Sequence, residues 1–338
     1  MITKAFIIAE IGINHNGNMN IAKKMIRVAK ECDADAVKFQ SYITSSLVTK
    51  SEKQMPYQLK NNKSKISQFK MLKKSELSFD QQKKLKNYCR DKDIEFISTP
   101  YDEKSAKFLC NIGVKKIKIA STDITNVPFL EFILDLKKKT VISTGATEMT
   151  ELEEIFKRIV NKKNKKNITI LQCTSFYPCE ESELNINSLK VLSKSFNMDV
   201  GLSDHSLSLE SGALAYAAGA KIIEKHFTLN RNFLGPDHKS SLLPKELKEY
   251  IRKVRSAEKM LGSMSKKILQ REKLIKTVIQ KSIFLKRNIL KGHKIKKNDL
   301  IIMRPSNSIK PKFFKQLINK KTKKNLKEYT KLKKSDFF

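Results

Sequence analysis

Several residue types and patterns are absent or scarce in this chain of 338 residues, and each shortage excludes a class of protein. There is no Trp, and only nine of the 69 cationic residues are Arg. The five Cys are odd in number and follow no CxxC spacing, which argues against a zinc ribbon or a disulfide scaffold and fits a reducing compartment. No apolar run approaches the ~20 residues of a membrane span, and residues 1–10 lead directly into a strand-like run without a cleavage site. We therefore expect a cytoplasmic protein with no membrane partner.

The formal net charge of +35 is the largest departure from ordinary composition. The Lys residues are spread along the whole chain, mostly as KK or KxxK pairs. A nucleic-acid-binding protein more often concentrates Arg in a basic stripe and adds aromatic residues for base stacking. We therefore interpret the charge as a solvated lysine-rich surface, expect no nucleic-acid partner, and expect fast association with anionic substrates.

Short apolar runs rich in β-branched residues alternate with helix-like stretches through most of the chain. The runs are 5–10, 35–40, 94–99, 115–120, 140–144, 168–173, 199–203 and 221–226. Continuous apolar strands separated by amphipathic helices indicate parallel strands covered by helices. Eight strands and eight helices in roughly 260 residues predict an α/β fold, the (β/α)8 TIM barrel. A doubly wound open sheet is the alternative, although no GxGxxG motif follows the first run.

The alternating pattern changes in two places. Residues 43–78 are polar and too long for a bare connection between strands, which predicts a lid or a substrate loop. After residue 265, a basic stretch is followed by short strand-like runs, a helical FFKQLI segment and a final strand near TKL. We therefore predict a barrel domain at 1–265, a linker at 266–280 and a small β-rich domain at 281–338.

Two of the five His, His205 and His226, stand at the ends of neighbouring predicted strands. The carboxyl ends of barrel strands meet at one mouth, where active sites of this fold lie. Neutral imidazoles bind divalent cations such as Mn²⁺, and a pair of them leaves coordination positions open for substrate and water. Core or helix-capping histidines are the structural alternative.

Two lysines, Lys38 and Lys118, also fall near predicted strand ends. With the hydroxyls of Ser121, Ser143 and Ser203 they predict a cradle for a phosphorylated anion. No Walker A motif is present, so this is not a P-loop site. The competing interpretation makes one of these lysines the Schiff-base nucleophile of a metal-free aldolase.

The carboxylates of Glu10 and Asp237 are expected at the same mouth, for proton transfer or for holding sugar hydroxyls. A helix cap or a salt bridge is the structural alternative for each. The residues by themselves thus leave three interpretations open: a metal-dependent enzyme acting on an anion, a lysine aldolase, and a non-enzymatic basic binding protein that uses the barrel as a scaffold.

An ordered set of motifs in residues 5–243 resembles the N-acetylneuraminate (sialic acid) synthase family. The motifs are IAEIGINHNG, VKFQSY, FISTPYD, KIKIASTDITN, VISTGAT, CTSFYP, VGLSDHS and EKHFTLNRNFLGPDHKSSL. The segment KRNILKGHKIKKNDLIIMRPSNSI resembles the antifreeze-like (SAF, β-clip) domain that follows the barrel in these enzymes. The string GPDHKSSL resembles members acting on N-acetylmannosamine or on the legionaminate precursor more than it resembles pseudaminate synthases.

This resemblance implies a metal-dependent condensation of phosphoenolpyruvate with the open-chain aldehyde of an N-acylated mannosamine-type sugar. Our first expectation is N-acetylmannosamine as acceptor, giving N-acetylneuraminate and phosphate. The alternative acceptor is 2,4-diacetamido-2,4,6-trideoxymannose, which makes the enzyme an N,N'-diacetyllegionaminate synthase. The metal is expected to be Mn²⁺, with Mg²⁺ or Co²⁺ as alternatives.

The resemblance also assigns roles to residues by motif. The expected metal ligands are His205 and His226. Catalysis is assigned to Glu10, Asp237 and Lys118, with Glu10 as the main proton carrier. The expected phosphoenolpyruvate pocket is Lys38, Thr99, Lys118, Ser121, Ser143, Ser175 and Ser203. The expected sugar contacts are Gln40, Tyr177, Asp237 and Arg304, and Arg304 is expected to act in the partner subunit of a domain-swapped homodimer.

The chain departs from the family pattern at a few positions. Ser175 stands where some members have Asn, which shortens one side chain of the phosphoenolpyruvate pocket. In the small domain PSNS replaces the usual PGNG, so Ser306 and Ser308 lack the freedom of Gly to adopt a positive φ behind Arg304. No departure removes an expected metal ligand or lysine, and we therefore expect an active enzyme.

Overall fold

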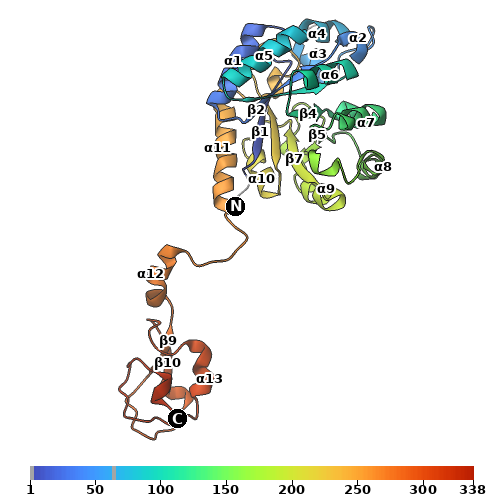
Figure 1. Ribbon diagram of the computed structural model, residues 1–338. Helices are drawn as coiled ribbons and strands as arrows, with labels where there is room; N and C mark the ends of the chain where they lie inside the picture. The colour runs from blue at the N-terminus through green and yellow to red at the C-terminus, as the bar shows by residue number, and fades with distance from the viewer. Residues whose placement is uncertain (1–3, 63–65) are drawn as a thin grey trace. The chain divides into compact units, whose positions relative to one another are not determined.

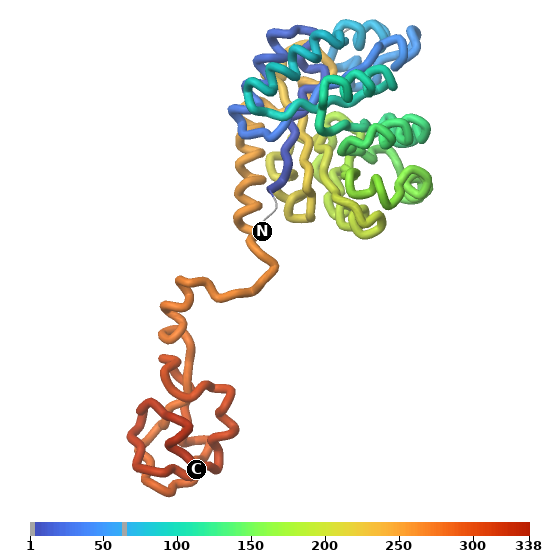
Figure 2. The backbone as a smooth tube through the Cα atoms, in the orientation of Figure 1, coloured from blue at the N-terminus to red at the C-terminus, as the bar shows by residue number. Residues whose placement is uncertain are grey.

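The computed structural model describes residues 4–62 and 66–338 (Figures 1 and 2). The chain divides into two compact units, Met1–Gly262 and Ser263–Phe338. Among the described residues, no helix is long and apolar enough to cross a membrane.

The first unit is a closed barrel of eight parallel strands in the described part of the chain, which confirms the predicted (β/α)8 fold. Each predicted apolar run overlaps one strand. In chain order the strands are β1 (Phe6–Gly12), β2 (Ala36–Ser41), β3 (Glu95–Pro100), β4 (Lys116–Ile119), β5 (Lys139–Ser143), β6 (Ile168–Cys173), β7 (Asp199–Asp204) and β8 (Ile222–His226). The barrel closes where β1 pairs with β8, with Glu10 beside His226.

Helices follow the strands and cover the barrel, as Figure 1 shows. They are α1 (Met19–Glu31), α5 (Phe79–Asp91), α6 (Glu103–Asn111), α7 (Val127–Asp135), α8 (Met149–Ile159), α9 (Ser188–Phe196), α10 (Ser211–Ala217) and α11 (Pro244–Leu261). Asp102 caps α6, since the Ser105 N–H donates to its carboxylate at 2.8 Å. α8 begins with a capping box, in which Glu151 reaches back to accept from the Glu148 N–H at 2.9 Å.

The barrel interior changes from apolar to polar along the strands. Ile8, Ala36, Ile97, Val141, Leu171 and Ile222 form a buried apolar cluster. Side chains alternate between the two faces of a strand, so residues two positions further on point inward as well. Those positions hold Glu10, Lys38, Thr99, Ser143, Cys173 and Glu224. The barrel is therefore closed below by aliphatic packing and polar at the carboxyl ends of its strands.

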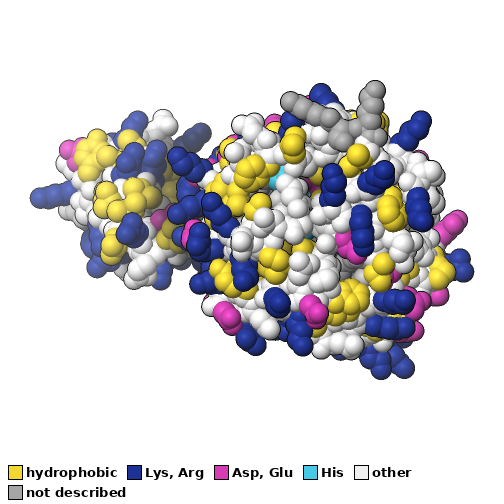
Figure 3. Space-filling view, turned by 90° about the horizontal axis from the view of Figure 1, so that it is seen from above, with side chains coloured by type: hydrophobic (Ala, Val, Ile, Leu, Met, Phe, Trp, Pro, Cys, Tyr) yellow, Lys and Arg dark blue, Asp and Glu magenta, His cyan; other side chains and the backbone are white. Residues whose placement is uncertain are grey.

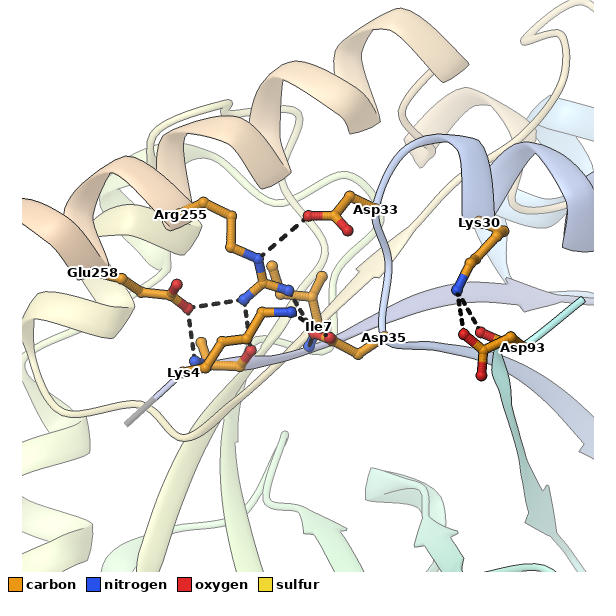
Figure 4. Close-up of polar contacts among 9 residues, drawn as sticks. Lys4, Ile7, Lys30, Asp33, Asp35, Asp93, Arg255 and Glu258 are labelled. Atoms are coloured by element: carbon orange, nitrogen blue, oxygen red, sulfur yellow. Dashed lines mark hydrogen bonds and ion pairs between the residues drawn. The ribbon is translucent and has the colours of Figure 1, made fainter. Parts of the chain in front are cut away.

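At the other end of the strands, Arg255 of α11 holds the start of β1 in place (Figure 4). Its guanidinium pairs with Asp35 at 2.6 Å and with Glu258 at 2.8 Å, and it donates to the Ala5 carbonyl at 2.8 Å. Asp35 in turn accepts from the Ile7 N–H at 2.8 Å. Figure 2 shows the same neighbourhood of β1 and α11, which are far apart in the sequence.

The segment 43–78 is more ordered than the predicted loop. Its described part contains three short helices, α2 (Thr44–Leu47), α3 (Pro56–Asn62) and α4 (Gln68–Ser75). The segment is fastened to the region after β8, because the Asn61 side chain donates to the Pro236 carbonyl at 2.6 Å. It therefore forms a structured wall beside the carboxyl ends of the strands.

The second unit contains α12 (Gln270–Ile279), β9 (Ser282–Leu285), β10 (Leu300–Met303) and α13 (Phe314–Leu317). β9 and β10 pair antiparallel, and a separate apolar core, which includes Ile283, Leu300 and Leu332, lies among these elements. The predicted strand near TKL is wrong, because the described residues 330–332 form no strand. The Leu332 N–H instead donates to the Ser308 hydroxyl at 2.7 Å.

The positive charge is not spread evenly, contrary to expectation. The second unit carries 24 Lys and Arg against four Asp and Glu, a net formal charge of +20 within 76 residues. The barrel unit carries the remaining +15 over 262 residues. Figure 3 shows Lys and Arg side chains over the visible face of each unit, with apolar side chains between them.

Candidate active site

A cavity of about 390 Å³ opens at the carboxyl ends of the strands. The structure brings most of the sequence-predicted site residues together on its lining: Glu10, Lys38, Gln40, Lys118, Ser121, Ser143, Ser175, Tyr177, Ser203, His205, His226 and Asp237. Thr99 lies just behind the lining, where its hydroxyl accepts from Lys38 Nζ at 3.1 Å. Arg304 belongs to the second unit.

The floor of the cavity is a cluster of two lysines and two glutamates. Lys38 Nζ lies 3.0 Å from Glu10 Oε1 and 3.7 Å from Glu224 Oε1. Lys118 Nζ also lies 3.7 Å from Glu224 Oε1, and the Ser203 hydroxyl donates to the same oxygen at 3.0 Å. Glu224 thus lies between the two ammonium groups that the sequence suggested as an anion cradle.

Burial and mutual charge shift the ionisation of this cluster. Burial raises the pKa of Glu10 to about 8, with Lys38 opposing the shift. Burial acts in the same direction on Glu224, but Lys118 and Lys38 outweigh it and hold its pKa below the ordinary value. Burial lowers the pKa of Lys118, whereas for Lys38 the pairing with Glu10 and Glu224 overcomes burial and raises the pKa. These shifts favour the ammonium form of Lys38, the carboxylate form of Glu224 and the protonated form of Glu10.

Hydroxyl groups line one side of this floor. The Ser143 hydroxyl is buried and finds no hydrogen-bond partner among the described residues. The Ser121 hydroxyl accepts from the Gly145 N–H at 2.9 Å. A Cβ at position 145 would lie only 2.1 Å from the Ser175 hydroxyl oxygen, so the close approach of these groups requires Gly. Together they offer donors to an anion bound at the lysines.

The two predicted metal ligands are neighbours on the cavity lining, with ring centroids 5.3 Å apart. His205 Nδ1 bonds to the Thr174 carbonyl at 2.7 Å, which leaves Nε2 as the acceptor nitrogen, 3.0 Å from the Tyr177 hydroxyl. His226 Nδ1 is buried and finds no partner in the described part of the chain. Burial keeps the pKa of His226 well below its usual value, so this imidazole is neutral.

A divalent cation fits this pair as an open site. Within residues 4–62 and 66–338, no group of three or more His, Cys, Asp and Glu is placed to hold a metal. The neutral, unsatisfied His226 and the fixed tautomer of His205 are suitable imidazole donors, and substrate or water oxygens would fill the other positions. Burial alone would lower the pKa of His205, but the nearby Cys173 raises it, so protons compete with a metal ion for this imidazole more than for His226.

Asp237 and two tyrosines, Tyr57 and Tyr177, also line the cavity. Burial raises the pKa of Asp237 to about 6. Tyr177 stacks on His205 and on Tyr57 of α3, with centroid distances of 4.0 and 5.2 Å. The wall from segment 43–78 thereby contacts the residues beside the candidate metal ligands.

Comparison with family models matches the NeuB family over residues 25–266 and the SAF domain over residues 280–337. The chain belongs to the NeuB family. This confirms the resemblance to sialic acid synthases with an antifreeze-like domain that the sequence motifs indicated.

Individual NeuB relatives are similar over nearly the whole chain. An N,N'-diacetyllegionaminic acid synthase from Campylobacter jejuni subsp. jejuni serotype O:2 is 40% identical over 326 residues, which cover 96% of this chain and 98% of that protein. A synthase of the same name from Legionella pneumophila subsp. pneumophila is 39% identical over 324 residues, covering 95% and 91%. The solved N-acetylneuraminic acid synthetase from Leptospira borgpetersenii serovar Hardjo-bovis matches with a TM-score of 0.71 and 33% identity, over 81% of this chain and 90% of that chain.

Sequence reasoning missed two buried residues of this NeuB site. Glu224 was overlooked although it lies two positions before His226 in β8, and the period of a strand places both on one face. Cys173, at the end of β6, lies 3.9 Å from His205 Nδ1. Burial opposes ionisation of this thiol, but His205 outweighs it and lowers the pKa of Cys173 to about 7.

The loop behind Arg304 tolerates its two serines. Neither Ser306 nor Ser308 has a positive φ, so the freedom of Gly is not needed at these positions. The Ser308 hydroxyl donates to the Ile283 carbonyl at 2.8 Å and its N–H donates to the Ser282 hydroxyl at 3.2 Å. The hydroxyl of Ser308 therefore fastens the loop to β9 by a contact that Gly would not make.

Proposed function

We propose that the protein is an N,N'-diacetyllegionaminate synthase. It condenses phosphoenolpyruvate with the open-chain aldehyde of 2,4-diacetamido-2,4,6-trideoxymannose and releases phosphate. The sequence placed N-acetylneuraminate synthesis first, but relatives 39–40% identical over at least 95% of this chain are legionaminic acid synthases, which favours the alternative acceptor. The observation that supports the chemistry is the buried floor, where two lysines flank Glu224 beneath a pair of imidazoles.

Phosphoenolpyruvate suits this floor because it carries a carboxylate and a phosphate. Lys38 and Lys118 supply two ammonium groups, and the buried Ser143 hydroxyl and the Ser121 hydroxyl supply donors. Both lysines are nearly inaccessible to solvent, at 4% and 2% exposure, so each charge interaction is strong there. Thr99 orients Lys38 from behind the lining, and Ser203 on the lining orients Glu224.

His205 and His226 would hold the divalent cation, with Mn²⁺ as the expected metal and Mg²⁺ or Co²⁺ as alternatives. When bound, the ion supplies Lewis-acid polarisation of the acceptor aldehyde. The bond from His205 Nδ1 to the Thr174 carbonyl fixes the ring orientation, and the Tyr177 hydroxyl would have to release Nε2 to the ion. Gln40, Tyr177 and Asp237 line the space above the floor and are the proposed sugar contacts in the barrel.

Glu10 is the proposed proton carrier. C3 of phosphoenolpyruvate forms a bond to the aldehyde carbon, whose oxygen then needs a proton. Water adds to C2 and loses one proton. The C2–O bond to phosphate then breaks as the C2 hydroxyl becomes the 2-keto carbonyl, and the remaining hydroxyl proton leaves with the phosphate. With a pKa of about 8, Glu10 begins protonated, can give its proton to the new alkoxide and can recover one from the water. Asp237, with a pKa of about 6, is the alternative acceptor for that second proton.

The function is tested by measuring phosphate release with phosphoenolpyruvate, Mn²⁺ and one acceptor at a time. The acceptors are 2,4-diacetamido-2,4,6-trideoxymannose, N-acetylmannosamine and N-acetylmannosamine 6-phosphate. The proposal expects the highest kcat/KM with the trideoxy sugar, loss of activity with EDTA and recovery with Mn²⁺. A preference for N-acetylmannosamine would return the function to N-acetylneuraminate synthesis. Borohydride trapping of pyruvate on Lys38 or Lys118, with activity unaffected by EDTA, would instead support the aldolase.

A further inference from the structure

The cavity has a charged floor and an apolar entrance. Glu10 and Lys118 on the floor are 1% and 2% exposed, whereas Met55 on the lining is 48% exposed. The apolar lining residues Leu47, Val48, Met55 and Leu72 all come from the segment 43–78, and Ile13 follows β1. The same segment also contributes Tyr57, Gln58 and Gln68 to the lining, so the aliphatic side chains form a patch beside polar groups.

The chemistry of the proposed reaction fixes which end of the sugar meets that patch. The aldehyde carbon must approach the phosphoenolpyruvate carbon within about 3–3.5 Å, so C1 of the acceptor lies just above the lysines. The open chain then extends from the floor toward the entrance. Its C4 to C6 atoms therefore reach the depth at which the aliphatic residues line the cavity.

The aliphatic patch has no group to pair with a charge. Among the described residues that line the cavity, the Lys and Arg side chains are Lys38 and Lys118, both on the floor. A phosphate at C6 would find no cation among the described lining residues of the entrance, and a hydroxyl set against the aliphatic patch would lose its hydrogen bonds to water. A C6 methyl and the methyl of a 4-acetamido group lose no such bonds, and each fills aliphatic space.

We propose that Leu47, Val48 and Met55 are specificity residues that select an acceptor with a 6-deoxy carbon and a 4-acylamino group. This inference rests on the proposed function, because it needs the acceptor aldehyde at the floor. The expected discrimination is about 10-fold to 200-fold, the range that one or two methyl-sized contacts provide.

The test is a double variant, Val48→Thr with Met55→Gln, which makes the entrance polar with little change in volume. The control with the same substitutions is Val191→Thr with Met260→Gln, since these two residues are exposed and apolar and do not line the cavity. For each protein, kcat/KM is measured with the trideoxy sugar and with N-acetylmannosamine. KM for phosphoenolpyruvate is measured in parallel.

In the double variant, kcat/KM with the trideoxy sugar divided by kcat/KM with N-acetylmannosamine should fall about 10-fold or more. The KM of the double variant for phosphoenolpyruvate should equal that of the wild type. The control variant should have the wild-type ratio of the two kcat/KM values. A wild-type preference for the trideoxy sugar that the double variant retains within twofold would overturn the entrance proposal alone. A wild-type preference for N-acetylmannosamine would overturn this inference together with the choice of acceptor.

Discussion

Lys225 Nζ lies 2.7 Å from Asp204 Oδ2 in a fully buried ion pair between neighbouring strands. The two residues are also backbone register partners of β7 and β8. Each stands directly before one of the proposed metal ligands, His205 or His226. Side chains alternate along a strand, so the pair points away from the cavity while the imidazoles point into it. The ion pair therefore fixes the register on which the spacing of the imidazoles depends.

Replacing Lys225 by Met should lower the free energy of unfolding by about 3–5 kcal/mol, because Asp204 is left charged and buried. It should also weaken Mn²⁺ binding about 10-fold, as loss of supporting contacts does at metal sites. Urea unfolding and electron paramagnetic resonance titration of Mn²⁺ measure the two effects. Arg255→Met is the control, because it breaks a buried network at the opposite end of the barrel (Figure 4). Unchanged Mn²⁺ affinity in Lys225→Met would limit the pair to a role in stability.

The rate should depend on the protonation of Glu10. Its pKa of about 8 means that the carboxyl is protonated below pH 8 and loses its proton above it. If the protonated form starts the reaction, kcat/KM is constant below that pH and falls as pH rises through about 8. In Glu10→Gln this fall at alkaline pH should disappear, and kcat should decrease about 10²–10⁴-fold. A pH profile of phosphate release checks both, and a fall that persists in Glu10→Gln would assign the titration to another group.

Asp299 should stabilise the second unit in a pH-dependent way. Its carboxylate pairs with Arg287 at 2.7 Å, accepts from the Lys296 N–H at 2.8 Å and contacts His293 Nε2 at 2.9 Å. Burial alone would raise its pKa, but these contacts lower it to about 2. The pKa in the folded protein is below the unfolded value, so the stabilisation is present above about pH 4 and is lost as pH falls toward 2.

Hydrogen exchange of amides in residues 282–337 of the full chain tests this. Asp299→Asn should reduce their protection at pH 7 by about 2 kcal/mol. It should also flatten the loss of protection between pH 4 and 2. Equal protection in the two proteins at neutral pH would contradict the prediction.

The homodimer implied by the family resemblance stays a prediction, and subunit mixing tests it. Arg304→Ala and Lys118→Ala should each be inactive. If Arg304 acts in the partner subunit, a mixture of the two that has exchanged subunits should regain about a quarter of wild-type activity, since half of the dimers contain one intact site. No recovery in dimers shown to have exchanged would place Arg304 in the same subunit as the site that it serves.

The strands could be predicted within one or two residues because their buried faces are nearly continuous apolar runs. AFIIAE and ITILQC, for example, are short and rich in apolar residues, which is typical of buried parallel strands. The short helices of segment 43–78 could not be predicted in the same way. α2 has only four residues and α3 seven, so tertiary contacts such as the bond from Asn61 to Pro236 determine them more than intrinsic propensity does.

The same distinction applies to the site. The motifs indicated the individual residues, but not how their charges compensate one another. Glu224 stands in a strand ending IIEKH, where a single acidic residue gives no sign of its partners. Lys38 and Lys118 lie far from it in sequence, and only closure of the barrel brings all three together.

Before any substrate arrives, the ammonium groups of the floor already have carboxyl neighbours. An entering anion must therefore compete with these carboxyl groups for the lysines, because the positive charge of the floor is already partly neutralised. Chloride or acetate offers no more charge than the internal carboxylate that it would replace. A molecule that carries both a carboxylate and a phosphate would pair with both lysines at once. It would therefore compete better than a single monovalent anion with the carboxyl groups of Glu10 and Glu224. The internal ion pairs of Lys38 and Lys118 should thus disfavour the binding of small monovalent anions in the cavity.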